Sequence, residues 1–216
     1  MMEKSPITIT ISRQMGSGGS YIGYSAAKEL GFKYIDREIL RQAAERLGTD
    51  TGALENLDER SPALIDKLLR GFSSGLPEIS LPLPQQRPVD HKELFAVECK
   101  IMNEIAERYS AVIVGRGGFN ALKNRPDVIR VFVHAPLEFR IERIMKAQNI
   151  KDKKEVQTRV KESDHIRAKF IRDMAGVDWT DARNYHLCID SSLFDFPTII
   201  EMIVKLAEKK NILTGC

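Results

Sequence analysis

The sequence predicts an α/β fold, a three-layer sandwich in which helices cover both faces of a five-stranded parallel sheet. Three observations predict it. Five short apolar runs have the character of buried strands, helical patterns lie between them, and the first run leads directly into a glycine-rich loop. Strands that alternate with helices favour a parallel sheet with right-handed crossovers. The chain of 216 residues is long enough for a single domain of this kind, which we expect to span residues 1–216.

The apolar runs mark the strands. In the first, Ile7, Ile9 and Ile11 alternate with threonines, which is the period of a strand. The five runs are Ile7–Ser12, Phe32–Ile35, Ala111–Val114, Val128–Val133 and Tyr185–Ile189. Parallel sheets bind their ligands beyond the carboxyl ends of the strands. The residues that directly follow these runs are therefore candidates for a site.

Apolar residues at helical spacing mark the helices. After the first strand, Ile22, Ala26 and Leu30 share one helix face, and Gly31 is a C-terminal stop. The other helical patterns cover Arg37–Leu47, His91–Arg108, Leu137–Ala147 and Phe196–Lys209.

Two segments depart from this pattern. Residues 49–90 contain five prolines, and we expect an insertion that is irregular and mobile, at least from Gly71 onward. Residues 151–172 are helical in pattern but highly charged. This stretch is either a solvated surface helix or a lid that brings arginines over a bound phosphate.

Composition limits the class of protein. The net charge of +3 gives no argument for nucleic-acid binding, and no apolar run is long enough to span a membrane. The three cysteines have no metal-ligand spacing and are odd in number, so we expect reduced thiols in the cytoplasm. The first strand begins within a few residues of the N-terminus, which argues against a secretory signal. Composition does not indicate the oligomeric state; a homodimer is possible.

The loop after the first strand has the context of a phosphate-binding loop, because glycines and a helix N-terminus direct several N–H groups to one point. The common pattern is G-x-x-x-x-G-K-[ST]. Aligned with Arg13 to Ser20, it puts Arg13 at the first glycine, Gly18 at the second, Gly19 at the lysine and Ser20 at the hydroxyl that holds Mg²⁺. The lysine that reaches the terminal phosphates is missing. Arg13 or an arginine from elsewhere is the candidate replacement.

Two other interpretations of the loop remain open. Gly16 and Gly18, with Asp36 about twenty residues further on, partly match a dinucleotide fingerprint. The third glycine of that fingerprint would fall at Tyr21. The loop could also be a purely structural turn.

Arginines and one acidic residue follow the other strands. Asp36 is an N-cap candidate, while Arg37 and Arg41 could reach a substrate phosphate. Arg116 lies between two glycines at the end of a strand, where its guanidinium could bind a phosphate in a bidentate manner. Arg140, Arg143 and Arg167 lie on predicted helices. Phosphoryl transfer needs this kind of positive charge on the transferred group and the leaving oxygen.

Several motifs occur in a specific order. They are Ile-Ser-Arg-Gln-x-Gly-Ser-Gly-Gly from Ile11, Phe-Lys-Tyr-Ile-Asp-Arg-Glu-Ile-Leu from Phe32, Val-Ile-Val-Gly-Arg-Gly from Val112, Val-Phe-Val-His-Ala-Pro from Val131 and Asp-x-x-Arg from Asp164. In this order the chain resembles the cytidylate kinase-like family, a branch of the nucleoside monophosphate kinases with the phosphate-loop fold. The resemblance covers nearly the whole chain apart from the proline-rich insertion.

The resemblance implies ATP and Mg²⁺ as cofactors and small nucleotides as substrates. It implies phosphate binding by Arg13, Gly16, Ser17, Gly18, Gly19 and Ser20, with Ser20 near the metal and with Arg140 and Arg143 close by. It implies acceptor binding by Asp36, Arg37, Arg41 and Arg116, and a lid role for Arg167. The insertion would lie on the acceptor side. Catalytic charge would come from Arg13, Arg116 and Arg167.

The chain departs from the cytidylate kinase pattern at three places. Gly19 replaces the lysine, Gly117 replaces the aspartate of Gly-Arg-Asp, and Arg37-Glu38 replaces Ser-Gly. Three hypotheses follow. The first is an ATP-dependent phosphotransferase with CMP or dCMP as the default acceptor. The second is a degenerate kinase that senses a nucleotide without turnover, and the third, suggested only by the glycines and Asp36, is a nicotinamide-dependent oxidoreductase.

Overall fold

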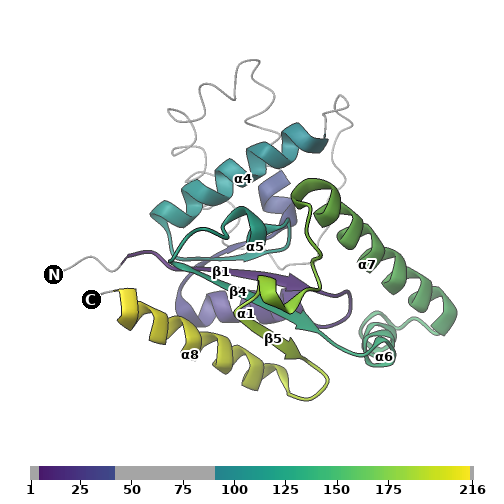
Figure 1. Cartoon of the computed structure of the whole chain (residues 1–216). Coiled ribbons are helices and arrows are strands. Elements are labelled where there is room, and N and C mark those ends of the chain that lie inside the picture. The colour runs from purple at the N-terminus through teal and green to yellow at the C-terminus, as the bar shows by residue number, and fades with distance from the viewer. Residues whose placement is uncertain (1–4, 42–90, 215–216) are drawn as a thin grey trace.

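A computed structural model describes residues 5–41 and 91–214. Its centre is a parallel sheet of five strands in the order β2-β3-β1-β4-β5 (Figure 1). The strands are β1 (Thr8–Arg13), β2 (Lys33–Ile35), β3 (Ala111–Val114), β4 (Val128–His134) and β5 (Leu187–Asp190). The predicted parallel α/β sandwich is therefore confirmed.

Helices cover both faces of the sheet (Figure 1). On one face, α1 (Gly19–Leu30) and α8 (Phe196–Thr214) pack over the isoleucines of β1. On the other face, α4 (His91–Arg108) packs over β2 and β3, and the short α5 (Gly118–Ala121) lies over β1. A buried apolar core thus lies on each side of the sheet, as expected for a parallel sheet whose central strands are covered by helices on both faces.

The ends of β1, β3 and β4 meet at one edge of the sheet. Ile11 pairs with Val114, and Arg13 pairs with Val133. Gly115 and the loop that follows Arg13 therefore leave the sheet side by side. This register brings two of the predicted site segments together.

Two helices lie beyond this edge (Figure 1). They are α6 (Leu137–Gln148) and α7 (Lys153–Ala175), which begins at an N-cap formed by Asp152. Val156 and Val160 of α7 pack against Ile141 and Ile144 of α6. The charged segment 151–172 is thus mostly one long helix with a narrow buried face, and its proposed role as a lid stays a prediction.

The expected elements agree closely with the structure, and α4 has the predicted bounds. The fifth strand differs. It begins at Leu187, not Tyr185, because a 3₁₀ turn over Ala182–Asn184 precedes it and the Tyr185 hydroxyl donates to the carbonyl of Trp179 at 2.5 Å. Residues 37–41 are helical, as expected. The rest of that predicted helix and the whole insertion 49–90 lie outside the described residues.

Candidate functional site

The loop between β1 and α1 presents unsatisfied N–H groups. Gly16 and Gly18 have φ angles of 83° and 85°, a region that glycine occupies without strain. Gly18 is the N-cap of α1, with no side-chain cap and no acidic residue in the first turn. Within the described residues, the N–H groups of Gly16, Gly18 and Gly19 make no hydrogen bond. An open helix N-terminus of this kind favours an anion.

Two serines hold the loop against the sheet. The buried Ser17 hydroxyl lies 2.9 Å from the Gln14 carbonyl and 3.1 Å from the Val133 carbonyl. The Ser191 hydroxyl donates to the Ser17 carbonyl at 2.7 Å. Of the predicted phosphate-binding residues, Ser17 thus directs its side chain into the scaffold and would offer a ligand only its backbone.

Arg140 and Arg143 of α6 contact the carbonyl groups of the loop. The buried Arg140 donates from Nη1 to the Met15 carbonyl at 3.0 Å and from Nε to the Ala135 carbonyl at 2.9 Å. Arg143 donates to the Gly16 carbonyl at 3.3 Å, and its guanidinium lies 4.9 Å from the centre of the Phe196 ring. Both therefore brace the loop, and direct phosphate binding by them stays a prediction.

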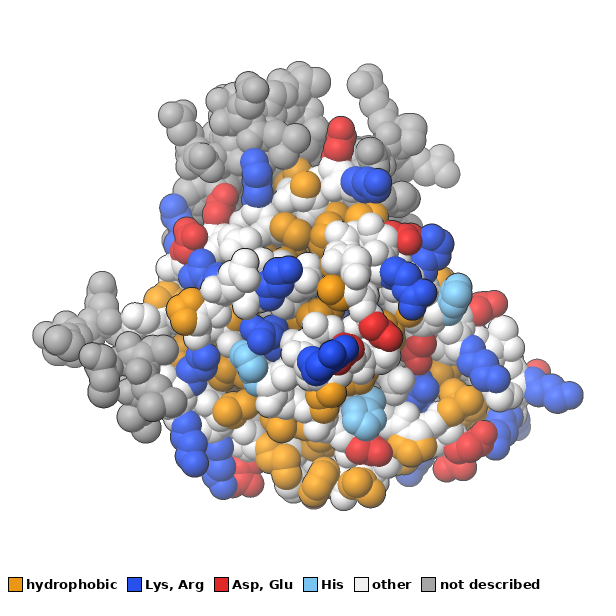
Figure 2. Space-filling model, viewed as in Figure 1, with side chains coloured by type: hydrophobic (Ala, Val, Ile, Leu, Met, Phe, Trp, Pro, Cys, Tyr) orange, Lys and Arg blue, Asp and Glu red, His pale blue; other side chains and the backbone are white. Residues whose placement is uncertain are grey.

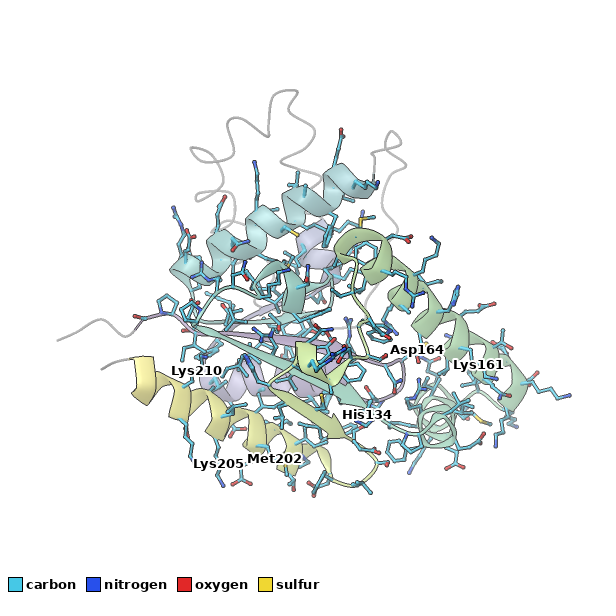
Figure 3. All side chains as sticks on the ribbon, in the orientation of Figure 1. His134, Lys161, Asp164, Met202, Lys205 and Lys210 are labelled. Carbon is cyan, nitrogen blue, oxygen red and sulfur yellow. The ribbon has the colours of Figure 1, made fainter. Side chains whose placement is uncertain are left out.

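Asp164 of α7 ties three segments together. Its carboxylate accepts from the Met15 N–H at 2.9 Å, from Arg140 Nη1 at 2.6 Å and from Arg167 Nη1 at 3.1 Å. Figure 3 labels Asp164 where α7 passes the end of the sheet. The Asp-x-x-Arg motif contains this signal, although the family resemblance implies a role only for its arginine.

Arg13 reaches from the end of β1 over the start of α1. Its Nε donates to the Ser20 hydroxyl at 3.3 Å, the only side-chain hydrogen bond that Arg13 makes within the described residues. The pKa of its guanidinium is lowered to about 10, chiefly by burial and then by the positive charge of Arg167. Arg37 acts in the same direction, whereas Tyr34 and Asp36 oppose it. The positive charge of Arg13 is therefore only partly compensated by the neighbouring residues of the site.

The predicted acceptor residues occupy the far side of the same cluster. Asp36 is an N-cap, because its Oδ1 accepts from the N–H groups of Glu38 at 2.9 Å and Ile39 at 3.0 Å. Arg41 forms an ion pair with Glu38 at 2.7 Å. Arg37 is exposed, and its positive charge acts to lower the pKa values of Arg13, Arg167 and Glu98. It therefore lies within electrostatic range of both the loop and Glu98.

Arg116 is held by a residue that sequence reasoning missed. Glu98 of α4 is fully buried, and its Oε2 accepts from Arg116 Nε at 2.7 Å and also from Nη2. Arg116 has an unusual φ of 49°, and its guanidinium lies 4.6 Å from the centre of the Phe170 ring of α7. The only sequence signal was an acidic residue on the apolar face of a helix, which could have pointed to a buried partner.

One carboxylate oxygen of Glu98 accepts no hydrogen bond from a described residue. This oxygen, Oε1, is buried and has no hydrogen-bond partner among the residues that the structure describes. Burial raises the pKa of the Glu98 carboxyl, opposed first by Arg116 and then by Arg37 and Arg41. The Glu98 carboxylate thus lies within electrostatic range of three arginines, and one of them, Arg41, is also paired with Glu38.

The arrangement can hold two anionic groups next to each other. Arg13 and Arg167 lie at the glycine loop, Arg116 and Arg41 lie near Glu98, and Arg37 connects the two sets electrostatically.

Elsewhere basic and acidic side chains are intermixed over the surface in view (Figure 2). Among residues 5–41 and 91–214, no three His, Cys, Asp or Glu side chains gather as a metal site, and no helix is long and apolar enough to cross a membrane.

Comparison with curated proteins gives relatives over most of the chain. It is 30% identical to a cytidylate kinase of Methanopyrus kandleri over 189 residues, which cover 86% of this chain and 85% of the relative. It is 26% identical to a cytidylate kinase of Archaeoglobus fulgidus, with coverage of 94% and 96%.

Solved structures share the fold. An uncharacterized protein from Eubacterium ventriosum superposes with a TM-score of 0.67 at 20% identity, covering 94% of this chain and 98% of that one. A gluconokinase from Sinorhizobium meliloti superposes with a TM-score of 0.50 at 16% identity and coverage of 96% and 97%. The family model described as "Cytidylate kinase-like family" matches residues 8–193. The chain therefore belongs to the cytidylate kinase-like family.

Proposed function

We propose that this protein is an ATP-dependent phosphotransferase that moves the γ-phosphoryl group to a nucleoside monophosphate, with CMP or dCMP as the first candidate. One observation carries the proposal. Arg13 lies at the uncapped N-terminus of α1, Arg116 and Arg41 lie near Glu98, and Arg37 is within electrostatic range of both, so that the phosphates of a donor and of an acceptor could lie side by side. The family and the names of its curated relatives support the same reaction class.

The reaction needs positioning and charge neutralisation more than covalent chemistry. An oxygen of the acceptor phosphate would form a bond to the γ-phosphorus while the bond to the β–γ bridging oxygen breaks, and ADP leaves. A phosphate dianion has no proton to lose, so this step needs no general base. Arg13 and Arg167 would bind the transferred group, and Arg37 and Arg116 the acceptor phosphate.

The residues present fit a magnesium ion bound with its nucleotide. Mg²⁺ in such sites uses one protein hydroxyl together with phosphate oxygens and waters. The Ser20 hydroxyl, at the start of α1 and beside the Arg13 side chain, would be that ligand. When bound, Mg²⁺ would supply charge neutralisation across the β- and γ-phosphates.

A nucleotide sensor without turnover is the second candidate, and Gly117 favours it. Family kinases have an aspartate here, whereas Gly117 has a φ of 67° and a Cβ placed on it would lie 3.2 Å from Ile171 Cδ1. An aspartate would be strained at this position. The carboxylate is therefore missing from this point of the site, although Glu98 supplies one nearby.

A single experiment separates the two candidates. Purified full-length protein is titrated with Mg·ATP by calorimetry, and nucleoside monophosphates are then added one at a time with ADP as the readout. We expect ADP formation that depends on one acceptor, CMP or dCMP first. Binding of Mg·ATP with no acceptor-dependent ADP would support the sensor and contradict the kinase.

A further inference from the structure

We infer that Arg13 supplies, from the first position of the loop, the phosphate-binding cation that the common pattern supplies from its seventh, and that Gly19 and Gly115 leave the room it needs. This inference rests on the proposed function, since it names the residue that would contact the terminal phosphates. The common pattern has a glycine at its first position and a lysine at its seventh. In this chain the cationic residue, Arg13, stands at the first position and a glycine, Gly19, stands at the seventh.

Gly19 is not required by its backbone conformation. Its φ lies outside the left-handed region, unlike those of Gly16 and Gly18. A side chain would nevertheless collide, because a Cβ built on Gly19 would overlap the Cβ of Arg13 and lie 3.0 Å from its Cγ. The two side chains thus exclude each other, and one of the two positions must be glycine.

Gly115 opens the second half of the path. A Cβ built on Gly115 would overlap Nη1 of Arg13 and approach its Cζ to 3.2 Å. Gly115 also has a φ of 86°, which favours glycine. The backbone conformation of the turn and the observed position of the Arg13 guanidinium therefore both depend on the absence of a side chain at this residue. The Arg13 side chain therefore passes between Gly19 and Gly115, at the ends of the neighbouring strands β1 and β3.

The end of this path is the place where a terminal phosphate would bind. Nε lies beside the Ser20 hydroxyl, the predicted metal ligand, and neither Nη1 nor Nη2 hydrogen-bonds to another described residue. The neighbouring charges of Arg167 and Arg37 are positive. An arginine can also bind two phosphate oxygens at once, which a lysine cannot do with the same planar geometry.

The test is a set of exchange variants in the full chain. Arg13→Gly, Gly19→Lys and the double variant Arg13→Gly/Gly19→Lys are compared with wild type for kcat with Mg·ATP and the acceptor. Loss of one such charge contact typically lowers kcat about 100- to 1,000-fold, which we expect for Arg13→Gly. Gly19→Lys should also lose activity, because its side chain collides with Arg13. The double variant should regain at least about tenfold over each single variant, since the common pattern is then restored.

Two further variants guard against trivial outcomes. Arg13→Met keeps the aliphatic stem of the side chain and should lose as much activity as Arg13→Gly, even if glycine weakens the end of β1. Arg183→Met removes an exposed arginine, whose side chain is 90% accessible, and should leave kcat unchanged. Thermal unfolding confirms that each variant is folded.

The outcomes separate the two claims. If wild type is active and the kcat of Arg13→Met lies within threefold of the wild-type value, the inference about Arg13 is overturned and the proposed kinase activity is not affected. A folded double variant no more active than Arg13→Gly would overturn the inference as well. Wild type that binds Mg·ATP without transferring phosphate would overturn only the proposed kinase activity. In that case the role of Arg13 is tested by binding, and we expect Arg13→Met to bind Mg·ATP at least about tenfold more weakly than wild type. Unchanged binding of Mg·ATP by Arg13→Met would overturn the inference about Arg13.

Discussion

Replacing Arg13 by methionine should make the protein more stable. The pKa of the guanidinium is lowered well below its ordinary value, to about 10, which means that the folded state disfavours the charged form. At 1.36 kcal/mol for each pKa unit the shift corresponds to about 3 kcal/mol. Because the side chain is partly exposed, water screens part of this cost, and we expect a net gain of about 1–2 kcal/mol.

The pH dependence has a definite sign. At pH 7 the guanidinium is protonated in the folded and the unfolded states, so the penalty is fully present. It disappears only as the pH rises through about 10 toward the higher pKa of the unfolded state. Urea unfolding of wild type and Arg13→Met should therefore give a constant difference in the free energy of unfolding between pH 6 and 9. The methionine keeps the stem packed, so cavity effects stay small.

Anion binding provides the matched control. Inorganic phosphate or Mg·ATP should stabilise wild type more than Arg13→Met, because the ligand compensates the charge that the variant lacks. A variant less stable than wild type by 1 kcal/mol or more in the absence of ligand would refute the reasoning. Such a result would mean that Arg13 serves the scaffold and not a ligand.

Three other substitutions test the surrounding contacts. Asp164→Asn removes the charge between Arg140 and Arg167 and should cost about 1–3 kcal/mol in urea unfolding; an unchanged midpoint would contradict its bracing role. Glu98→Gln should raise the KM for the acceptor at least about tenfold with little effect on that for Mg·ATP, because it loosens Arg116. Equal effects on both would argue against an acceptor role. Thr10→Val should be neutral or stabilise by up to about 1 kcal/mol, since the buried Thr10 hydroxyl has no hydrogen-bond partner within residues 5–41 and 91–214; clear destabilisation would show that this hydroxyl is bonded.

The sheet was predictable because the apolar pattern of each strand can be recognised in the local sequence. Alternation in β1, the continuous apolar run of β3 and the largely apolar run of β4 follow from burial between two helix layers, and α4 repeats its apolar residues at helical spacing. Tyr185 misled the prediction of β5 because a buried aromatic residue looks the same in a strand and in a turn. The hydrogen bonds of Tyr185 distinguish the two, because its hydroxyl donates to the Trp179 carbonyl and its N–H donates to the Ala182 carbonyl.

The site was predictable only in part, since its decisive contacts join distant residues. The glycines of the loop and the arginines could be listed from the sequence. The contact of Asp164 with the Met15 N–H and the pairing of Glu98 with Arg116 require the fold. Arg13 and Gly19 were both visible as departures from the pattern, but only the structure shows that their side-chain positions overlap.

Phosphorus NMR of one reaction mixture tests the proposed activity most directly. Wild type is incubated with Mg·ATP and CMP, and then with dCMP and the other nucleoside monophosphates in turn. The appearance of a nucleoside diphosphate from the acceptor, together with ADP and only in the presence of enzyme, is the predicted result. Unchanged acceptor in every mixture, from protein that binds Mg·ATP, would contradict phosphoryl transfer to nucleoside monophosphates.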